Sequence, residues 1–178
     1  MSEIAKRRFV RQQGFRDAPP ASCAYTYSAL MFQPRLLAAV VLLAVLLQSA
    51  TMFLVLAGIL WWNVLVAPRN PFDALYNLAI AGPRHLPPLD PAPAPRRFAQ
   101  GMAGTILGGA GVAILAGWPR LAWILEGLVV VALGALVLGR FCLGSYLYHL
   151  LRGETSFANR TLPWSRAEEE RGRTDQGL

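Results

Sequence analysis

The sequence predicts an all-α membrane protein, with four transmembrane helices arranged as two parallel helical-hairpin halves and short interfacial helices on the cytoplasmic side. The composition indicates a membrane protein, because 54% of the 178 residues are hydrophobic and only 15% are charged. Residues 36–68 and 98–119 carry no charge, and residues 121–139 carry only Glu126. Uncharged runs of this length are typical of transmembrane helices.

The first uncharged run is too long for one helix. As a single helix it would extend about 50 Å, whereas the hydrocarbon core of a bilayer is about 30 Å thick. Polar and small residues at positions 48–51 lie in its middle, where we expect a tight turn at the outer interface. With two helices here, every lysine and arginine except Arg120 lies on one side, which the positive-inside rule assigns to the cytoplasm. We therefore expect a multi-pass plasma-membrane protein with both termini in the cytoplasm.

The chain divides into three regions on this prediction. A basic cytoplasmic segment (residues 1–30) precedes a transmembrane domain (31–153), and a polar tail (154–178) has too few apolar residues to pack, so we expect it to be disordered. A proline-rich cytoplasmic linker, residues 82–97, joins the two halves, because proline cannot continue a helix. The first two of the four expected spans are short for a bilayer, and the four lie at about residues 35–49, 52–67, 98–116 and 121–139.

Both halves follow one plan of basic entry, helix, turn and helix, and each ends in an arginine followed by an aromatic-rich segment. Arg69 precedes Tyr76, and Arg140 precedes Phe141 and Tyr148. Two halves of two spans each would be parallel repeats related by an axis along the membrane normal. Arginine and aromatic residues also gather at headgroup boundaries without any repeat, so convergence explains the match about as well.

The third expected helix carries a stripe of glycines that predicts close helix packing. Small residues at this spacing let two backbones approach and gain dispersion contacts that lipid would not replace. The partner is either another helix of this chain or a second protomer. The stripe consists of Gly101, Gly104, Gly108 and Gly111.

Two polar residues, Glu126 and Asn63, fall within expected spans. A carboxylate in a membrane helix is costly, so Glu126 is a candidate proton-accepting site. We favour a structural role, because Glu126 lies about two turns below the outer surface. At that depth it can pair with Arg120, or be protonated and hydrogen-bond to Gln48 or Thr51. Asn63 lies near the inner end of the second helix, beside two tryptophans that an aromatic belt explains.

The segment after Gly139 predicts a short interfacial helix with a polar stripe formed by Cys142, Ser145, His149 and Arg152. Cys142 and His149 are about 10 Å apart along such a helix, so they cannot share a metal or act as a nucleophile and base. Ser145 and His149 are four residues apart and can touch.

Cys142 is the candidate thiol of this segment. If a new helix begins near Arg140, the thiol lies at a helix N-terminus beside a cation, and both favour the thiolate. We favour inert packing, because free cysteine is a small apolar residue and Cys142 has no resolving partner. The spacing between Cys142 and Cys23 fits neither a structural zinc site nor a disulfide framework.

The corresponding segment of the first half offers Arg69, Asp73 and Asn77 at i, i+4 and i+8. This spacing predicts a local salt bridge with an amide beside it. Together with Arg140, these residues form the expected cytoplasmic face, which is either a structural surface of the helix ends or a docking face.

The motifs PFDALYN, PAPRRFAQG and FCLGSYLYHLL resemble a family of small bacterial integral membrane proteins classed as a domain of unknown function. The resemblance covers about Met31 to Arg152. It implies about four spans in a bacterial inner membrane and a Phe-Cys-x-Gly signature, which Phe141, Cys142 and Gly144 match. A second cysteine often follows in the family, but Ser145 stands at that position here. The two-cysteine couple that some relatives imply is therefore incomplete, and the family supplies no established activity.

No catalytic constellation, metal site or cofactor motif stands out, which favours a non-enzymatic role. The leading expectation is a structural or partner-binding membrane module. Its partners would be the lipid bilayer and either a second copy or another membrane protein, and not nucleic acid, although the net charge is +7. Two alternatives remain open: a thiol or sulfur relay that uses Cys142, and a small-solute or proton transporter that uses Glu126.

Overall fold

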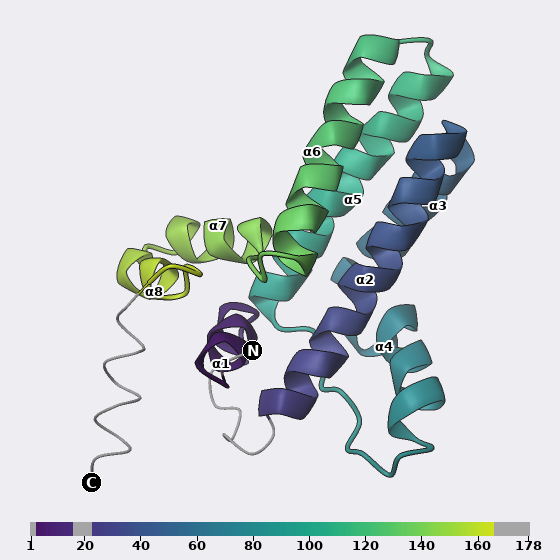
Figure 1. The fold of residues 1–178 in the computed structure, drawn as a ribbon. Coiled ribbons are helices and arrows are strands. Elements are labelled where there is room, and N and C mark those ends of the chain that lie inside the picture. Colours follow the sequence, from purple (N-terminus) through teal and green to yellow (C-terminus); the bar gives the residue numbers. More distant parts are fainter. Residues whose placement is uncertain (1–2, 16–22, 166–178) are drawn as a thin grey trace, which may run out of the picture.

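A computed structural model describes residues 3–15 and 23–165, and this part of the chain is helical without any strand. The order of elements is shown in Figure 1. The α-helices are α1 (Glu3–Gln12), α2 (Cys23–Leu47), α3 (Ala50–Leu65), α4 (Pro71–Tyr76), α5 (Ala94–Leu115), α6 (Pro119–Val137), α7 (Leu143–Leu151) and α8 (Thr155–Arg160), with a 3-10 turn η2 (Ala67–Arg69) and a π-helical turn η3 (Asn77–Ala81).

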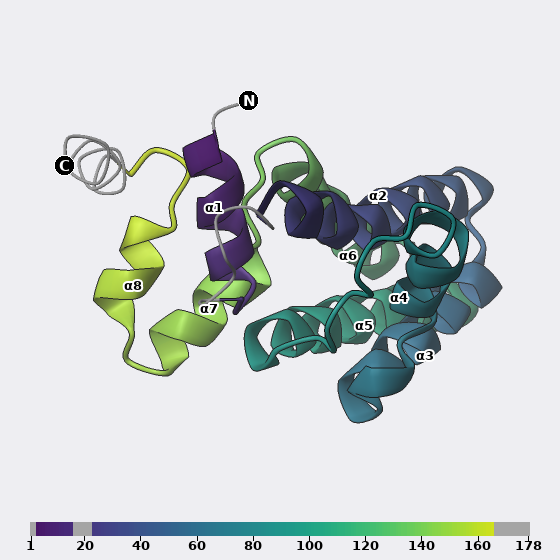
Figure 2. The ribbon, with the colours of Figure 1, turned by 90° about the horizontal axis from the view of Figure 1, so that it is seen from below.

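The four longest helices run side by side as a bundle. Figure 1 shows the α2–α3 turn and the α5–α6 turn at one end of this bundle, and the short helices α1, α4, α7 and α8 at the other. Seen from below, α1 lies between α2 and the pair formed by α7 and α8 (Figure 2). Helix α3 packs chiefly against α5 rather than against α2, and α5 also packs against α6 and α7. Helix α5 is therefore the central element.

Three of these helices are long and apolar enough to cross a membrane: Tyr25–Leu47, Ala94–Leu115 and Pro119–Val137. Helix α3 is apolar but shorter. Helix α2 begins well before the boundary expected near residue 35, because residues 25–34 carry no charge and the helix accommodates Pro34. The start of α5 likewise places Arg96 in its first turn instead of in the linker.

Both turns at the far end of the bundle have recognisable helix-ending chemistry. Gln48 adopts a left-handed conformation with φ of 46°, and the Ser49 N–H donates to the Ala44 carbonyl at 3.0 Å, which ends α2 in a Schellman motif. The Ser49 side chain then accepts from a backbone N–H in the first turn of α3. In the other turn Gly117 supplies φ of 68° and Pro119 begins α6. The first uncharged run is thus divided at Gln48 and Ser49.

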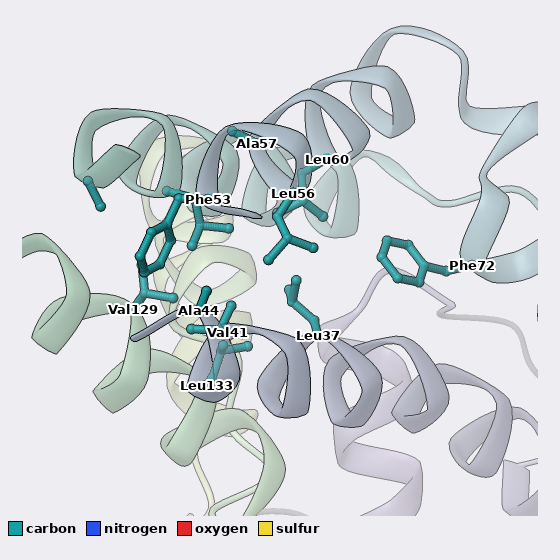
Figure 3. Packing of buried hydrophobic residues seen from close by; sticks show 12 residues of the cluster. Leu37, Val41, Ala44, Phe53, Leu56, Ala57, Leu60, Phe72, Val129 and Leu133 are labelled. Carbon is teal, nitrogen blue, oxygen red and sulfur yellow. The ribbon is translucent and has the colours of Figure 1, made fainter. Parts of the chain in front are cut away.

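An apolar core lies between α2, α3, α5 and α6. Val41, Phe53 and Leu60 are fully buried in it. Figure 3 shows side chains of this core, among them Leu37, Val41, Ala44, Phe53, Leu56, Leu60, Val129 and Leu133.

The glycine stripe of α5 faces α3 of the same chain. A methyl group on Gly104 would lie 3.3 Å from the Leu60 Cβ atom, and one on Gly111 would lie 2.9 Å from the Leu54 Cγ atom. Closely packed side chains and backbone of α3 thus occupy the positions that side chains on α5 would take. The partner of the stripe is α3, and these glycines are not free to receive a second protomer.

The polar ends of the chain contribute helices that pack on the bundle. Arg8 of α1 donates from Nη1 to the carbonyls of Leu162 and Pro163, and from Nη2 to that of Ser165, at 2.8–2.9 Å. Helix α8 lies in the first part of the tail that was expected to be disordered. The residues after it contact Arg8 of α1, and Arg11 of α1 lies 5.9 Å from the centroid of the Phe157 ring in α8. The composition of the tail alone does not indicate these contacts. Residues 16–22 of the expected N-terminal segment and 166–178 of the expected tail lie outside the described residues.

Candidate functional site

A cavity of about 330 Å³ lies between α2, α5 and α6 and reaches the start of α7. Most of its wall is apolar, with Leu37, Ile106 and Leu128 among the lining residues. Its polar lining residues come from α5, from the first part of α2, from the end of α1 and from the start of α7. They are Gln13, Gln33, Arg96, Gln100 and Cys142. The cavity therefore combines a long apolar wall with one polar end, on the side of the short helices.

A buried ion pair supports the polar end. Arg96 of α5 donates to the two carboxylate oxygens of Asp73 at 2.8 and 3.3 Å. Only 5% of Arg96 and 8% of Asp73 is exposed. Asn70 also donates to the Asp73 carboxylate, at 2.8 Å. The pair is thus neutral as a unit and hydrogen-bonded, which buried charges require.

The arginine fixes the orientation of two glutamine amides. Arg96 Nη2 donates to Gln33 Oε1 at 2.7 Å. Because a guanidinium has donors only, Gln33 must present its oxygen here. Gln100 Nε2 donates to the same oxygen at 3.0 Å, which leaves Gln100 Oε1 pointing elsewhere. This oxygen is buried and has no hydrogen-bond donor within the described part of the chain.

Cys142 lies where α6 gives way to α7. Helix α6 ends at Val137, Arg140 adopts φ of 54°, and α7 begins at Leu143. Cys142 is the residue before the first turn of α7, is 6% exposed and lines the cavity. The helix therefore breaks at Arg140, which is one of the two arrangements that the sequence allowed.

Ser145 accounts for the hydrogen bonding of the thiol. Its Oγ lies 3.3 Å from Cys142 Sγ and 3.4 Å from the Pro95 carbonyl oxygen. The serine hydroxyl has one hydrogen, so it donates either to Cys142 Sγ or to the Pro95 carbonyl, and in the second case its oxygen can accept from the Cys142 S–H.

His149 belongs to a separate buried cluster and not to the cavity. Its Nδ1 lies 2.7 Å from a carboxylate oxygen of Glu154, and its Nε2 lies 3.3 Å from the carbonyl oxygen of Gln12. Gln12 Oε1 in turn accepts from the Cys142 backbone N–H at 3.0 Å. Ser145 and His149 are both buried in α7, so this part of the expected polar stripe faces the protein, whereas Arg152 is exposed. The cluster attaches α1 to α7, and no group of three potential metal ligands occurs in the described residues.

Glu126 and Asn63 are buried outside the cavity. Glu126 is 1% exposed, and its Oε2 accepts from Gln48 Nε2 at 3.0 Å. Its Oε1, and both side-chain polar atoms of Asn63, have no partner within the described residues. Glu126 thus ties α6 to the α2–α3 turn through Gln48, one of the partners that the sequence suggested.

The structure differs from the expected cytoplasmic face in the ion-pair partner of Asp73. The local pair with Arg69 is replaced by the pair with Arg96, because burial of Asp73 demands a partner that is also buried. Asn77 accepts from the Leu89 backbone N–H at 3.0 Å and so fixes the linker. Arg69 and Arg140 are exposed.

Sequence reasoning missed Gln12, Gln33, Arg96 and Gln100 as site residues. The available signal was the position of Gln33 and Gln100 as isolated amides at the edges of apolar runs. Arg96 looked like an interfacial residue because it stands beside Arg97. Arg97 itself caps a helix end, because its guanidinium donates to the Val64 carbonyl at the C-terminus of α3.

A family model described as a domain of unknown function, DUF4395, matches residues 28–152, which is more than half of the chain. The chain belongs to the DUF4395 family. No curated protein and no solved structure matches it. The match agrees with the resemblance to a family of unknown function, and the matched DUF4395 region contains all of the lining residues of the cavity except Phe9 and Gln13.

The Phe-Cys-x-Gly residues of this DUF4395 chain have distinct structural roles. The Phe141 ring contacts the Tyr146 ring at an interplanar angle of 57°, and Cys142 lines the cavity. A methyl group on Gly144 would lie 2.6 Å from the Ala99 Cα atom. The glycine therefore allows α7 to approach the backbone of α5, which closes the polar end of the cavity.

Proposed function

We propose that this chain is a four-span membrane protein in which α3 is a short fourth span and both termini are cytoplasmic. The side-by-side packing of α3 and α5 and the position of both inter-helix turns at one end support this topology (Figure 1). The arginines support it too, because Arg120 alone among the described cations stands at the end with the turns.

The topology is tested by labelling single cysteines with a membrane-impermeant maleimide. Leu47 and Ala116 are exposed residues at the two turns. In a variant without native cysteines, we expect Leu47→Cys and Ala116→Cys to be labelled from the same side of sealed vesicles. Labelling from opposite sides would mean that α3 does not cross, and would overturn the four-span proposal.

We further propose that the protein is a non-enzymatic binding protein for a small, mainly apolar molecule. The observation that carries this is the cavity, with apolar walls and one polar end within a bundle of membrane-length helices. Binding sites for small molecules are typically concave, mostly apolar and equipped with a few polar groups. Association of two copies through the glycine stripe is not supported, because α3 covers those glycines.

A thermal shift with 1-decanol tests this proposal. A ligand at 100 times its Kd stabilises the folded state by about 2.7 kcal/mol, which corresponds to about 5–11 °C for a chain of this size. Ala103→Phe places a large side chain on the cavity wall, and Val112→Phe adds the same side chain at an exposed position of α5. We expect the shift in the wild type and in Val112→Phe but not in Ala103→Phe. Equal shifts in all three would refute cavity binding.

Thiol exchange at Cys142 is a second candidate function, supported by the position of the thiol at the cavity wall. In such a step the thiol loses its proton, bonds to one sulfur of an incoming disulfide and releases the other sulfur as a thiol. A lipid-soluble aromatic disulfide should then form a mixed disulfide at Cys142, and Cys142→Ser should abolish it. A thiol that stays unmodified in the folded protein would exclude this role. Transport through Glu126 gains no support, because Glu126 does not line the cavity.

A further inference from the structure

We propose that a second pocket, between α2 and the α4–η3 segment, binds the phosphate of an anionic phospholipid head group. This basic pocket has a volume of about 460 Å³, and its lining includes Arg35 and Arg84 but no acidic side chain. It shares no lining residue with the cavity between α2, α5 and α6. The inference therefore does not depend on ligand binding in that cavity, and uses only the membrane position of α2.

Helical spacing places the lining residues on two facing surfaces. On α2, Phe32 and Arg35 lie at i and i+3 and so share one face. On the other side, Tyr76, Ile80 and Arg84 lie at i, i+4 and i+8 through η3 and the turn that follows it. Helix α4 packs beside α2 (Figure 1). Each side of the basic pocket therefore contributes one arginine.

Apolar packing holds the two sides of the basic pocket together. The ring centroids of Phe32 and Tyr76 are 5.5 Å apart. Tyr76 and Ala81 are buried members of one apolar cluster, against which Phe32 packs. The Leu86 N–H donates to the Ala81 carbonyl at 3.0 Å, which fixes the turn that carries Arg84. The backbone on both sides is thus held in place before any ligand binds.

Both arginines of the basic pocket are available to a ligand. Arg35 and Arg84 are exposed, and neither guanidinium has a hydrogen-bond or ion-pair partner among the described residues. Arg96, by contrast, is buried and donates to Asp73. Guanidinium donors match the oxygens of a phosphate in both geometry and charge. Two such groups without a carboxylate beside them favour a ligand that carries net negative charge.

The position of Arg35 in α2 favours a lipid over a soluble anion. Arg35 is the last charged residue before the uncharged run 36–68. Side chains of an α-helix point toward its N-terminus, and this end of α2 lies on the side of the short helices (Figure 1). An arginine here keeps its stem against apolar surface and its charge at the level of the head groups. Basic pockets between membrane helices at this level suit anionic head groups.

The test is competition in native mass spectrometry of the full chain in detergent. The probes are dioctanoyl phosphatidylglycerol and dioctanoyl phosphatidylcholine, which share their acyl chains and phosphate but differ in net charge. One unit of net charge about 4 Å from an arginine in water-like surroundings changes affinity about fivefold. With two arginines we expect the wild type to prefer phosphatidylglycerol by about 5- to 30-fold. Equal binding of the two lipids would overturn the proposal.

Variants assign the preference to the basic pocket. Arg35→Gln and Arg84→Gln should each reduce it about fivefold, and the double variant should abolish it. Arg69→Gln removes an exposed arginine outside the pocket and should retain the preference. A preference that persists in the double variant would place the lipid elsewhere and overturn the site. Displacement of the lipid by glycerol 3-phosphate at equal concentration would assign the pocket to a soluble phosphate and overturn the lipid proposal. The wild-type comparison is decisive even if a variant does not fold.

Discussion

The ion pair between Arg96 and Asp73 is the interaction whose loss should damage the polar end most. Arg96→Met removes two charge-assisted hydrogen bonds, of 2.8 and 3.3 Å, and leaves the Asp73 carboxylate buried. Breaking a buried pair by removing one partner typically costs about 3–5 kcal/mol. For a chain of this size that corresponds to a fall in Tm of about 6–20 °C. The assay is thermal unfolding in detergent, followed by tryptophan fluorescence.

Two further variants make this prediction specific. Arg96→Met combined with Asp73→Leu leaves no charge buried and should recover more than half of the lost stability, because an apolar pair replaces a buried ion pair at little cost. Arg69→Met removes an exposed arginine at the same end of the bundle, and should change the free energy of unfolding by less than about 0.5 kcal/mol. If Arg96→Met shifts Tm no more than Arg69→Met, the pair does not hold the polar end and the reasoning fails.

Two other substitutions have contrasting expected effects. Gly144→Ala should destabilise the protein by about 1–3 kcal/mol through its clash with Ala99, whereas Gly134→Ala, which has open space around it, should raise stability by about 0.5–1 kcal/mol; equal chemical or thermal unfolding midpoints would contradict this. Glu126→Gln keeps an oxygen for the Gln48 amide and should change the unfolding free energy by less than about 1 kcal/mol, so a loss of several kcal/mol would show that the carboxyl group itself is needed.

The helices and their turns were accessible from local sequence signals. Uncharged runs predict membrane helices, and a polar interruption in such a run, as at Gln48, predicts a turn. The position of Gly139 and Arg140 raised a helix break as one of two arrangements, but local sequence could not decide it. The chain ends were harder, because Arg8 donates to the carbonyls of Leu162 and Pro163 just after α8, a contact between opposite ends of the chain.

The cavity could not be predicted, because its polar end joins residues that are far apart in the sequence. Asp73 had a nearer apparent partner in Arg69, and Arg96 had a sufficient explanation as a basic residue beside a membrane helix. Gln33 and Gln100 show no motif on their own. Only the folded bundle, in which Gln33 of α2 accepts from Arg96 and Gln100 of α5, brings these side chains together.

Photolabelling shows whether the space between α2, α5 and α6 binds a small, mainly apolar molecule. An aliphatic alcohol that carries a diazirine near the end of its chain is irradiated with the wild-type protein, and the labelled peptides are mapped. We expect saturable labelling of cavity-lining residues such as Ile106 and Leu128, with loss of this labelling in excess 1-decanol. Labelling confined to exposed residues such as Leu46 and Leu138, without competition by 1-decanol, would contradict the account.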